Sequence, residues 1–178
     1  FKEVERRLGS VEIIAEDLGI IDDGVTMLRD GFGFPGMNIL MFAFDGSEDN
    51  GYLPSNIAEN SVTYTGTHDN DTALGFLEGM DEAQFKDFKK QLRKTIKQQN
   101  AYIPVVDRTD AAKALCVSAA YAKSYLTVLP VQDILCLDNS ARMNVPSTSV
   151  GNWRFRLTKM PGRNAMAQLK KLISDCGR

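Results

Sequence analysis

The chain has 178 residues, which is enough to bury a hydrophobic core without disulfides or a structural metal. Its 43% hydrophobic and 25% charged residues are typical of a soluble globular protein. A net charge of −2 argues against nucleic acid or an anionic membrane as a partner, and no apolar run reaches the length of a membrane span. The three cysteines are widely spaced and form no Cys-x-x-Cys pair, so we expect free thiols in a reducing, cytoplasmic compartment and no metal site.

Four short apolar segments are predicted to be strands: Val11–Ala15, Asn38–Phe44, Ser61–Thr65 and Tyr125–Leu129. They are apolar throughout rather than alternating, which is typical of a parallel sheet buried on both faces. Capping residues and apolar spacing predict helices from Asp22 or Asp23 to Gly31, Asp81 to Gln99, Thr109 or Asp110 to Ala122, and Arg163 to Asp175. This alternation predicts an α/β fold with its active site at the carboxyl ends of the strands.

The predicted helix from Asp81 to Gln99 has one apolar and one basic face. The apolar stripe is formed by Phe85, Phe88, Leu92 and Ile96. The basic face carries Lys86, Lys89, Lys90, Arg93, Lys94 and Lys97. An anion-binding helix and a solvated outer face are both open interpretations, and we favour the solvated face because charge runs on amphipathic helices usually face water.

Two clusters of side chains capable of chemistry follow predicted strands. Glu16 and Asp17 follow the first strand, and residues 68–71 (His-Asp-Asn-Asp) follow the third. Two carboxylates that converge from different strand ends suit glycosidic bond cleavage, in which one carboxyl donates a proton and another stays ionised. The same oxygens could hold Mg²⁺ for phosphoryl transfer, and both clusters could instead be helix caps or hydrogen-bonded turns.

Aromatic residues near these clusters could stack on the C–H face of a sugar ring. The candidates are Phe42, Phe44, Tyr52, Tyr64 and Trp153. Core packing is the alternative and is favoured for most of them. Phe42 and Phe44 are predicted to share one strand face because side chains alternate along a strand, so the pattern does not place both in the cleft.

Several longer motifs are family-specific. The most distinctive strings are Ala15-Glu16-Asp17-Leu18-Gly19 and Thr65-Gly66-Thr67-His68-Asp69-Asn70-Asp71-Thr72. Others are Phe34-Pro35-Gly36-Met37, Tyr52-Leu53-Pro54, Arg142-Met143-Asn144-Val145-Pro146 and Gly151-Asn152-Trp153-Arg154-Phe155-Arg156. In these motifs and their order the chain resembles the 4-α-glucanotransferases (amylomaltase or disproportionating enzyme). The resemblance implies a retaining transferase that acts on malto-oligosaccharides and uses no metal or organic cofactor.

The resemblance also implies roles for individual residues. Glu16 would be the general acid/base after the fifth barrel strand, and Asp69 would be the transition-state stabiliser after the seventh. Substrate-binding roles fall on Asp17, Phe42, His68 and Asn144. His68 would bind hydroxyls of the donor sugar, Phe42 would line the acceptor side, and Asn144 would lie in the loop that closes over the substrate.

The nucleophile of the family lies upstream, after the fourth strand, in an Arg-x-Asp pattern. In this sequence the strings that place an Asp near an Arg in a similar way come only after Glu16. They are Leu28-Arg29-Asp30 and Asp107-Arg108-Thr109-Asp110. A whole barrel needs roughly 250 residues. We therefore expect residues 1–178 to be the C-terminal half of a catalytic (β/α)8 TIM barrel, about strands five to eight, with the N-terminal half and its nucleophile absent. Open strand edges would then favour self-association or a requirement for the missing half.

Three positions depart from the family pattern, with Met41 in place of Gln, Ser55 in place of His and Ser147 in place of Gly. Each removes a polar contact or loop flexibility near the cleft. The resulting prediction is a fragment of a 4-α-glucanotransferase that is inactive alone. The alternative is a non-catalytic glucan-binding or folding fragment, which predicts weak maltose binding that Phe42→Ala reduces.

Overall fold

The computed structural model describes residues 1–178 and centres on a parallel three-stranded sheet in the order β1-β2-β3. The strands are β1 (Gly36–Ile39), β2 (Ser61–Tyr64) and β3 (Leu126–Val128). The helices are α1 (Lys2–Leu8), α2 (Asp23–Gly31), α3 (Ala73–Glu78), α4 (Glu82–Gln98), α5 (Arg108–Ala120), α6 (Val131–Ile134) and α7 (Arg163–Asp175). Two 3₁₀ turns are η1 (Leu40–Phe42) and η2 (Asn139–Ala141). The predicted parallel α/β class is confirmed.

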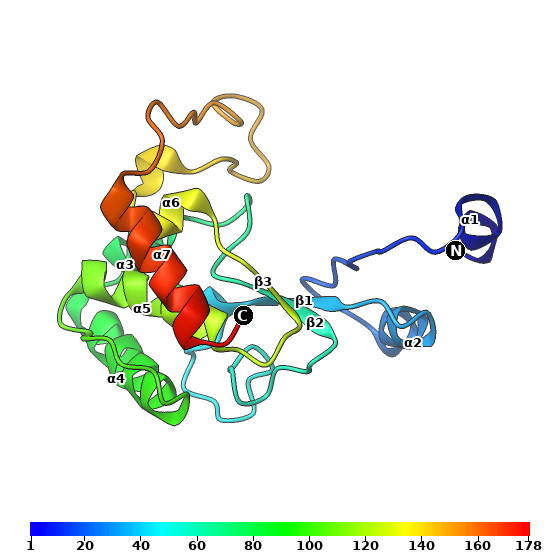
Figure 1. The fold of residues 1–178 in the computed structure, drawn as a ribbon, viewed down its shortest axis with the longest axis horizontal. Helices are drawn as coiled ribbons and strands as arrows, with labels where there is room; N and C mark the ends of the chain where they lie inside the picture. Colours follow the sequence, from blue (N-terminus) through cyan, green and yellow to red (C-terminus); the bar gives the residue numbers. More distant parts are fainter.

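The helices are distributed unevenly about the sheet. Helices α3, α4, α5 and α7 gather on one side, whereas the N-terminal segment with α1 and α2 extends away from the body on the other (Figure 1). Neither α1 nor α2 contributes a buried residue. The hydrophobic core therefore lies between the sheet and the cluster of α3, α4 and α5.

The segment Val11–Ala15 does not form the predicted strand, and the reason lies in its hydrogen bonds. Ala15 N–H donates to the carbonyl of Pro35 at 2.9 Å, as a strand beside β1 would. The next donor of a parallel ladder, Met37 N–H, instead bonds Oδ1 of Asp17 at 2.7 Å. Because the Ala15–Pro35 bond is its one backbone hydrogen bond here, the segment lies beside β1 but does not continue the hydrogen-bonded ladder of the sheet.

The second predicted strand, Asn38–Phe44, is also too long. Strand β1 ends at Ile39, and the chain turns through η1. Because a 3₁₀ turn rotates successive side chains by about 120°, Phe42 and Phe44 do not share a face. Phe44 is buried against Phe88, with ring centroids 4.9 Å apart, whereas Phe42 is 45% exposed.

The predicted helix at Asp81–Gln99 forms as α4. Asp81 and Gln84 form a reciprocal capping box, and Phe85, Phe88, Leu92 and Ile96 are buried. Helix α5 is capped by Asp107, whose side chain accepts from Asp110 N–H, and not by Thr109 or Asp110 as predicted. Asp110 occupies the third helical position, and its backbone N–H is the donor that the Asp107 side chain accepts from.

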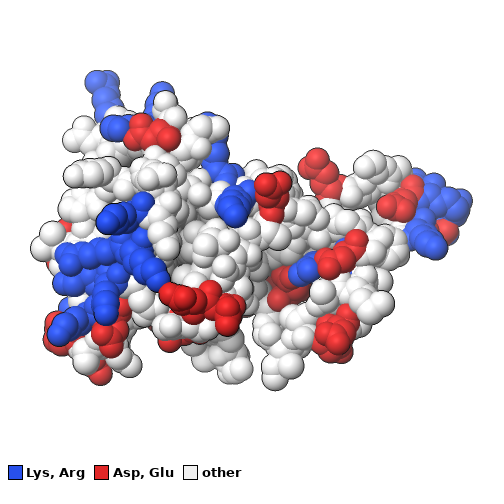
Figure 2. Space-filling model, turned by 90° about the horizontal axis from the view of Figure 1, so that it is seen from below, with Lys and Arg blue, Asp and Glu red and all other residues white.

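The basic face of α4 looks outward, and Figure 2 shows its Lys and Arg side chains gathered at the left end of the molecule. Lys94 pairs with Glu48 at 2.8 Å, and Lys89 bonds the carbonyl of Val106 at 3.1 Å. Arg93 donates to the carbonyl of Val105. The helix therefore presents a solvated face that also fastens two loops.

Strand β3 is not buried on both faces, in contrast to the prediction from its apolar sequence. Leu126 and Val128 are 37% and 39% exposed, while Val62 in the neighbouring strand β2 is fully buried. Strand β3 pairs only with β2, so its outer edge has no strand partner.

Asp133 connects the end of the sheet to the helical layer. It lies in α6, is 2% exposed, and accepts hydrogen bonds from Ala73 N–H, at 2.7 Å, and from the hydroxyl of Thr65. It thereby joins the end of β2 to the first turn of α3. Burial raises the pKa of the Asp133 carboxyl, and the two hydrogen bonds oppose that rise.

We predict that this buried carboxyl makes stability depend on pH. A pKa raised in the folded state means that folding favours the protonated form, so stability is fully present below the unfolded value and is lost as pH rises through the folded value. The free energy of unfolding, relative to Asp133→Asn, should therefore fall as pH rises above about 4. Urea unfolding followed by circular dichroism from about pH 3 to 7 measures this, with exposed Asp49→Asn as control. A difference independent of pH would contradict the prediction.

Candidate active site

The turn after β2 is held by its own side chains. Oδ1 of Asn70 accepts from Thr67 N–H at 2.8 Å and from the Thr67 hydroxyl at 3.0 Å. Asp69 N–H donates to the Thr67 hydroxyl at 3.3 Å. These local bonds are the Asx and Ser/Thr turn chemistry of residues 67–70, and they present His68 and Asp69 at the carboxyl end of the strand.

The loop that follows η2 forms the second wall of the site, and Arg142 joins it to the turn. The three guanidinium nitrogens of Arg142 bond three acceptors: the Asp71 carboxylate, the Asp69 carbonyl at 2.7 Å and the Asn144 carbonyl at 2.7 Å. The Arg142 side chain is only 22% exposed. The turn and the loop are therefore fixed to each other by a partly buried cation.

Asn144 adds two further bonds across the same gap. Its N–H donates to the His68 carbonyl at 3.1 Å, and its Nδ2 donates to Oδ1 of Asp69 at 2.6 Å. Nε2 of His68 lies 3.3 Å from that same oxygen. The other carboxylate oxygen of Asp69 receives no hydrogen bond from the protein, and the side chain is 45% exposed. Asp69 is thus oriented on one side and open to a ligand on the other.

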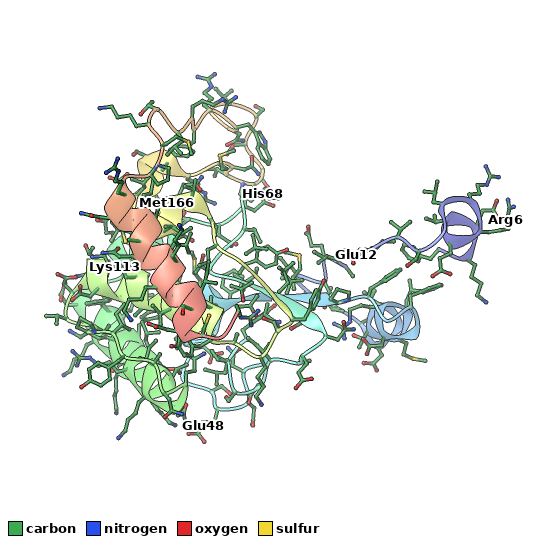
Figure 3. The ribbon with its side chains drawn as sticks, in the orientation of Figure 1. Arg6, Glu12, Glu48, His68, Lys113 and Met166 are labelled. Carbon is green, nitrogen blue, oxygen red and sulfur yellow. The ribbon has the colours of Figure 1, made fainter.

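A cavity of about 210 Å³ lies beside this cluster. His68, Asp71 and Arg142 line it from the turn and the loop, and Gln132 and Asp133 line it from α6. Figure 3 shows His68 next to the loop that follows α6. Eight of its ten lining residues carry polar or charged side chains that can bond hydroxyl groups, and Asp69 and Asn144 are not among the ten.

The remaining predicted site residues lie apart from this cluster. Glu16 is exposed on the N-terminal segment, and no side-chain hydrogen bond or ion pair joins it to His68, Asp69 or Asn144. Phe42 follows β1 and packs edge-to-face on Tyr52, with ring centroids 6.0 Å apart. The structure therefore brings together His68, Asp69 and Asn144 but not Glu16 or Phe42.

Asp17 has both carboxylate oxygens occupied. Oδ2 pairs with Arg29 and Oδ1 accepts from Met37 N–H, and the Asp17 side chain is 9% exposed. A Cβ at position 36 would collide with this carboxylate, which explains the glycine there. The geometry gives Asp17 the task of fixing the segment before α2 to the start of β1.

The sequence motifs assign no role to Arg142, and Asp71 appears in them only as a member of the 68–71 cluster. The signal was present, because Arg142 stands two residues before Asn144 in one of the family motifs. Its three acceptors come from positions 69, 71 and 144, and no sequence spacing links the first two to the third.

The three departures from the family pattern have different structural settings. Met41 is 3% exposed, belongs to the core and packs against Gly66, so its apolar side chain is accommodated. Ser55 is exposed and bonds only its neighbour Asn56, at 3.2 Å. Ser147 has a φ of +63°, in the left-handed region that favours glycine.

Comparison with known proteins agrees with this fold. The 4-alpha-glucanotransferase family matches residues 1–161, and the chain therefore belongs to that family. The 4-alpha-glucanotransferase DPE1 of Arabidopsis thaliana, named chloroplastic/amyloplastic, is 40% identical over 182 residues, which cover 100% of this chain and 30% of that protein. The 4-alpha-glucanotransferase of Synechocystis sp. is 40% identical over 158 residues, covering 88% and 29%.

A solved structure shows the same relationship. The amylomaltase from Streptococcus agalactiae in complex with acarbose is similar with a TM-score of 0.85 and 32% identity, covering 99% of this chain and 34% of that one. The chain spans about a third of the length of these relatives. No helix of the structure combines the length and apolarity needed to cross a membrane.

We predict that Arg142→Gln uncouples the loop from the turn. The variant loses charge-assisted bonds to a carboxylate and two carbonyls, and the free energy of unfolding should fall by about 2 to 4 kcal/mol. The imidazole resonance of His68, the only histidine, should also shift in the NMR spectrum. Arg163→Gln is the matched control, because Arg163 is exposed and makes no side-chain hydrogen bond. Equal stability of the two variants would contradict the role of Arg142 in holding the loop to the turn.

We predict that Ser147→Gly stabilises the protein. A non-glycine residue in the left-handed region is strained, and relief of that strain should raise the free energy of unfolding by about 1 kcal/mol or less, since glycine also gains freedom in the unfolded chain. Ser149→Gly in the same loop, where φ is not positive, should instead be neutral or destabilising. Thermal unfolding of both variants measures the difference, and a destabilised Ser147→Gly would contradict it.

Proposed function

We propose that residues 1–178 form the C-terminal half of the catalytic (β/α)8 barrel of a 4-α-glucanotransferase, which transfers α-1,4-glucan segments between malto-oligosaccharides. The observation that carries this is the Asp69–His68–Asn144 cluster at the carboxyl end of β2 in a member of that family. Strands β1, β2 and β3 pair in parallel in chain order, and segment 11–15 makes one backbone bond beside β1; in the proposal these four segments are strands five to eight. The likeness to amylomaltase over 99% of the chain supports this assignment.

In this proposal Asp69 stabilises the transition state. Cleavage of the glycosidic bond builds positive charge on the sugar, and an ionised carboxylate nearby lowers the energy of that state. Asn144 and His68 hold one oxygen of Asp69, which leaves the other for a sugar hydroxyl. The exposed half of His68 is placed to bind another hydroxyl.

Glu16 is proposed as the general acid/base. It would donate its proton to the oxygen of the scissile bond as a nucleophile attacks the anomeric carbon, and would later remove a proton from the 4-hydroxyl of the acceptor. Phe42 is proposed to line the acceptor side, where its 45% exposed ring can meet a sugar face. Asp17, fixed by Arg29 and Met37, is proposed to act on substrate only through the segment that carries Glu16.

The nucleophile is proposed to come from outside residues 1–178. The Asp residues of the two Arg-x-Asp-like strings lie in helices: Asp30 in α2 and Asp110 in α5. Asp30 is ion-paired with Arg29, and Asp110 is in the first turn of α5. The chain by itself should therefore not break the glucosidic bond.

The open edges of the sheet are proposed to bind the rest of the barrel. Val11 and Ile14 beside β1 are each 40% exposed, and Leu126 and Val128 in β3 are similarly open. Apolar side chains on unpaired edges favour association. A complementary half barrel would cover both edges at once, and self-association of this chain is the alternative way to cover them.

We predict that the 178-residue chain alone does not convert maltotriose into glucose and longer oligomers. A chimaera in which it replaces the matching 34% of the S. agalactiae amylomaltase should do so. In that chimaera, Glu16→Gln should lower kcat by about 10²- to 10⁴-fold because the proton donor is lost. Asp69→Asn should lower kcat by about 10²- to 10³-fold because transition-state charge is no longer stabilised. Chromatography of the products measures each rate.

Glu12→Gln is the matched control for Glu16→Gln. Glu12 lies on the same exposed segment and makes no side-chain hydrogen bond, so its variant should keep the chimaera's activity. Circular dichroism of each chimaera verifies folding. Turnover of maltotriose by the chain alone, abolished by Glu16→Gln, would overturn the proposal that the nucleophile is missing. A folded chimaera whose activity is insensitive to both substitutions would overturn the assigned roles.

A further inference from the structure

Trp153 is the only tryptophan, and it lies on the only histidine. The centroids of the Trp153 and His68 rings are 5.0 Å apart, and their planes are inclined by 37°. Trp153 is nevertheless 51% exposed. Because one face of the indole is against the imidazole, the exposure leaves the remainder of the ring available to a ligand. A core-packing role does not account for a half-exposed indole.

The backbone around Trp153 fixes its direction before any ligand binds. Trp153 has a φ of +62°, an uncommon left-handed conformation for a bulky residue. Its N–H donates to the carbonyl of Met143 at 2.6 Å. The side chain of Asn152 closes the loop by accepting from Val145 N–H at 3.0 Å and donating to the Thr148 carbonyl at 3.0 Å. Strained backbone held by several bonds is frequent at ligand sites.

The groups around the indole have the chemistry of a saccharide site. The Asn144 amide donates to Oδ1 of Asp69, Nε2 of His68 lies 3.3 Å from the same oxygen, and the His68 ring contacts Trp153. A pyranose binds where a flat apolar ring meets its C–H face and polar groups bond its hydroxyls. Trp153 supplies the flat ring that the rest of the cluster lacks.

We infer that Trp153 is a substrate-stacking residue, on whose free face one glucosyl unit of the glucan packs while the opposite face supports His68. The inference rests on the proposed function, because it takes the ligand of the Asp69 site to be a malto-oligosaccharide. It adds a residue that sets affinity for the sugar rather than the rate of bond cleavage.

The two unique side chains make the test direct. Maltotriose is added to the 178-residue chain up to millimolar concentration, and the Trp153 indole N–H and the His68 imidazole are followed by NMR. Both resonances should move with one saturation curve. With His68 as the probe, Trp153→Ala should raise Kd by about tenfold or more, and Trp153→Phe, which keeps an aromatic ring, should raise it less. Tyr102→Ala, which removes a fully exposed aromatic ring elsewhere, should leave Kd unchanged.

The outcomes separate this inference from the proposed function. Movement of the His68 resonance with an unmoved indole, or an unchanged Kd in Trp153→Ala, would overturn the stacking role and leave the glucan site standing. If neither resonance moves, this chain holds no glucan and the stacking role falls; the proposed function is then judged separately by turnover of the chimaera. In an active chimaera, Trp153→Ala should raise KM and leave kcat within a fewfold, and a fall in kcat alone would also overturn the inference.

Discussion

The site depends on one cation, the guanidinium of Arg142. Three oxygen acceptors converge on it, the carboxylate of Asp71 and the carbonyls of Asp69 and Asn144. The positive charge of Arg142 offsets the repulsion between these oxygens and, together with the two hydrogen bonds of Asn144, holds the turn after β2 against the loop after η2. The planar fork of arginine suits three acceptors in different directions better than the point charge of lysine. Contacts of Asn144 and Trp153 with His68 and Asp69 all follow from this closure.

Arg142 can fix the turn to the loop because the segments on either side of the turn are themselves anchored. Asp133 fixes the end of β2 to the start of α3, and the Asn139 side chain accepts from Thr72 N–H at 3.0 Å one residue earlier. A Cβ at Gly75 would occupy the space of the Asn139 side chain, so glycine is needed for that approach. The turn of residues 67–71, which carries Asp69, therefore lies between the buried strand β2 and the buried start of α3. Small displacements of either would be carried to Asp69.

Local patterns were sufficient for elements whose partners lie within the same stretch of sequence. The apolar stripe and capping box of α4 are readable because all their members fall within residues 81–96. The segment 11–15 has the composition of a strand, but a strand needs a ladder, and Asp17 takes the donor that would extend it. The prediction that Phe42 and Phe44 share one strand face was wrong because the chain turns at η1, where Leu40 and Met41 pack into the core. The family motifs contain His68, Asp69 and Asn144, but only the folded chain shows that Arg142 bonds Asp69 and Asn144 together with Asp71.

The proposed acid and its proposed partner have very different surroundings. Asp69 accepts a hydrogen bond from the Asn144 side chain and lies beside His68. A carboxyl that must donate a proton needs burial or neighbouring negative charge to keep that proton. Glu16 is exposed on a segment with one backbone bond to the strand beside it, so burial within these residues does not supply this. The same open edge that lacks a strand partner is the edge that carries Glu16. In the proposed whole barrel, the polypeptide that pairs with this edge would supply the nucleophile and would also enclose Glu16, so both parts of the proposed chemistry depend on pairing at the same edge.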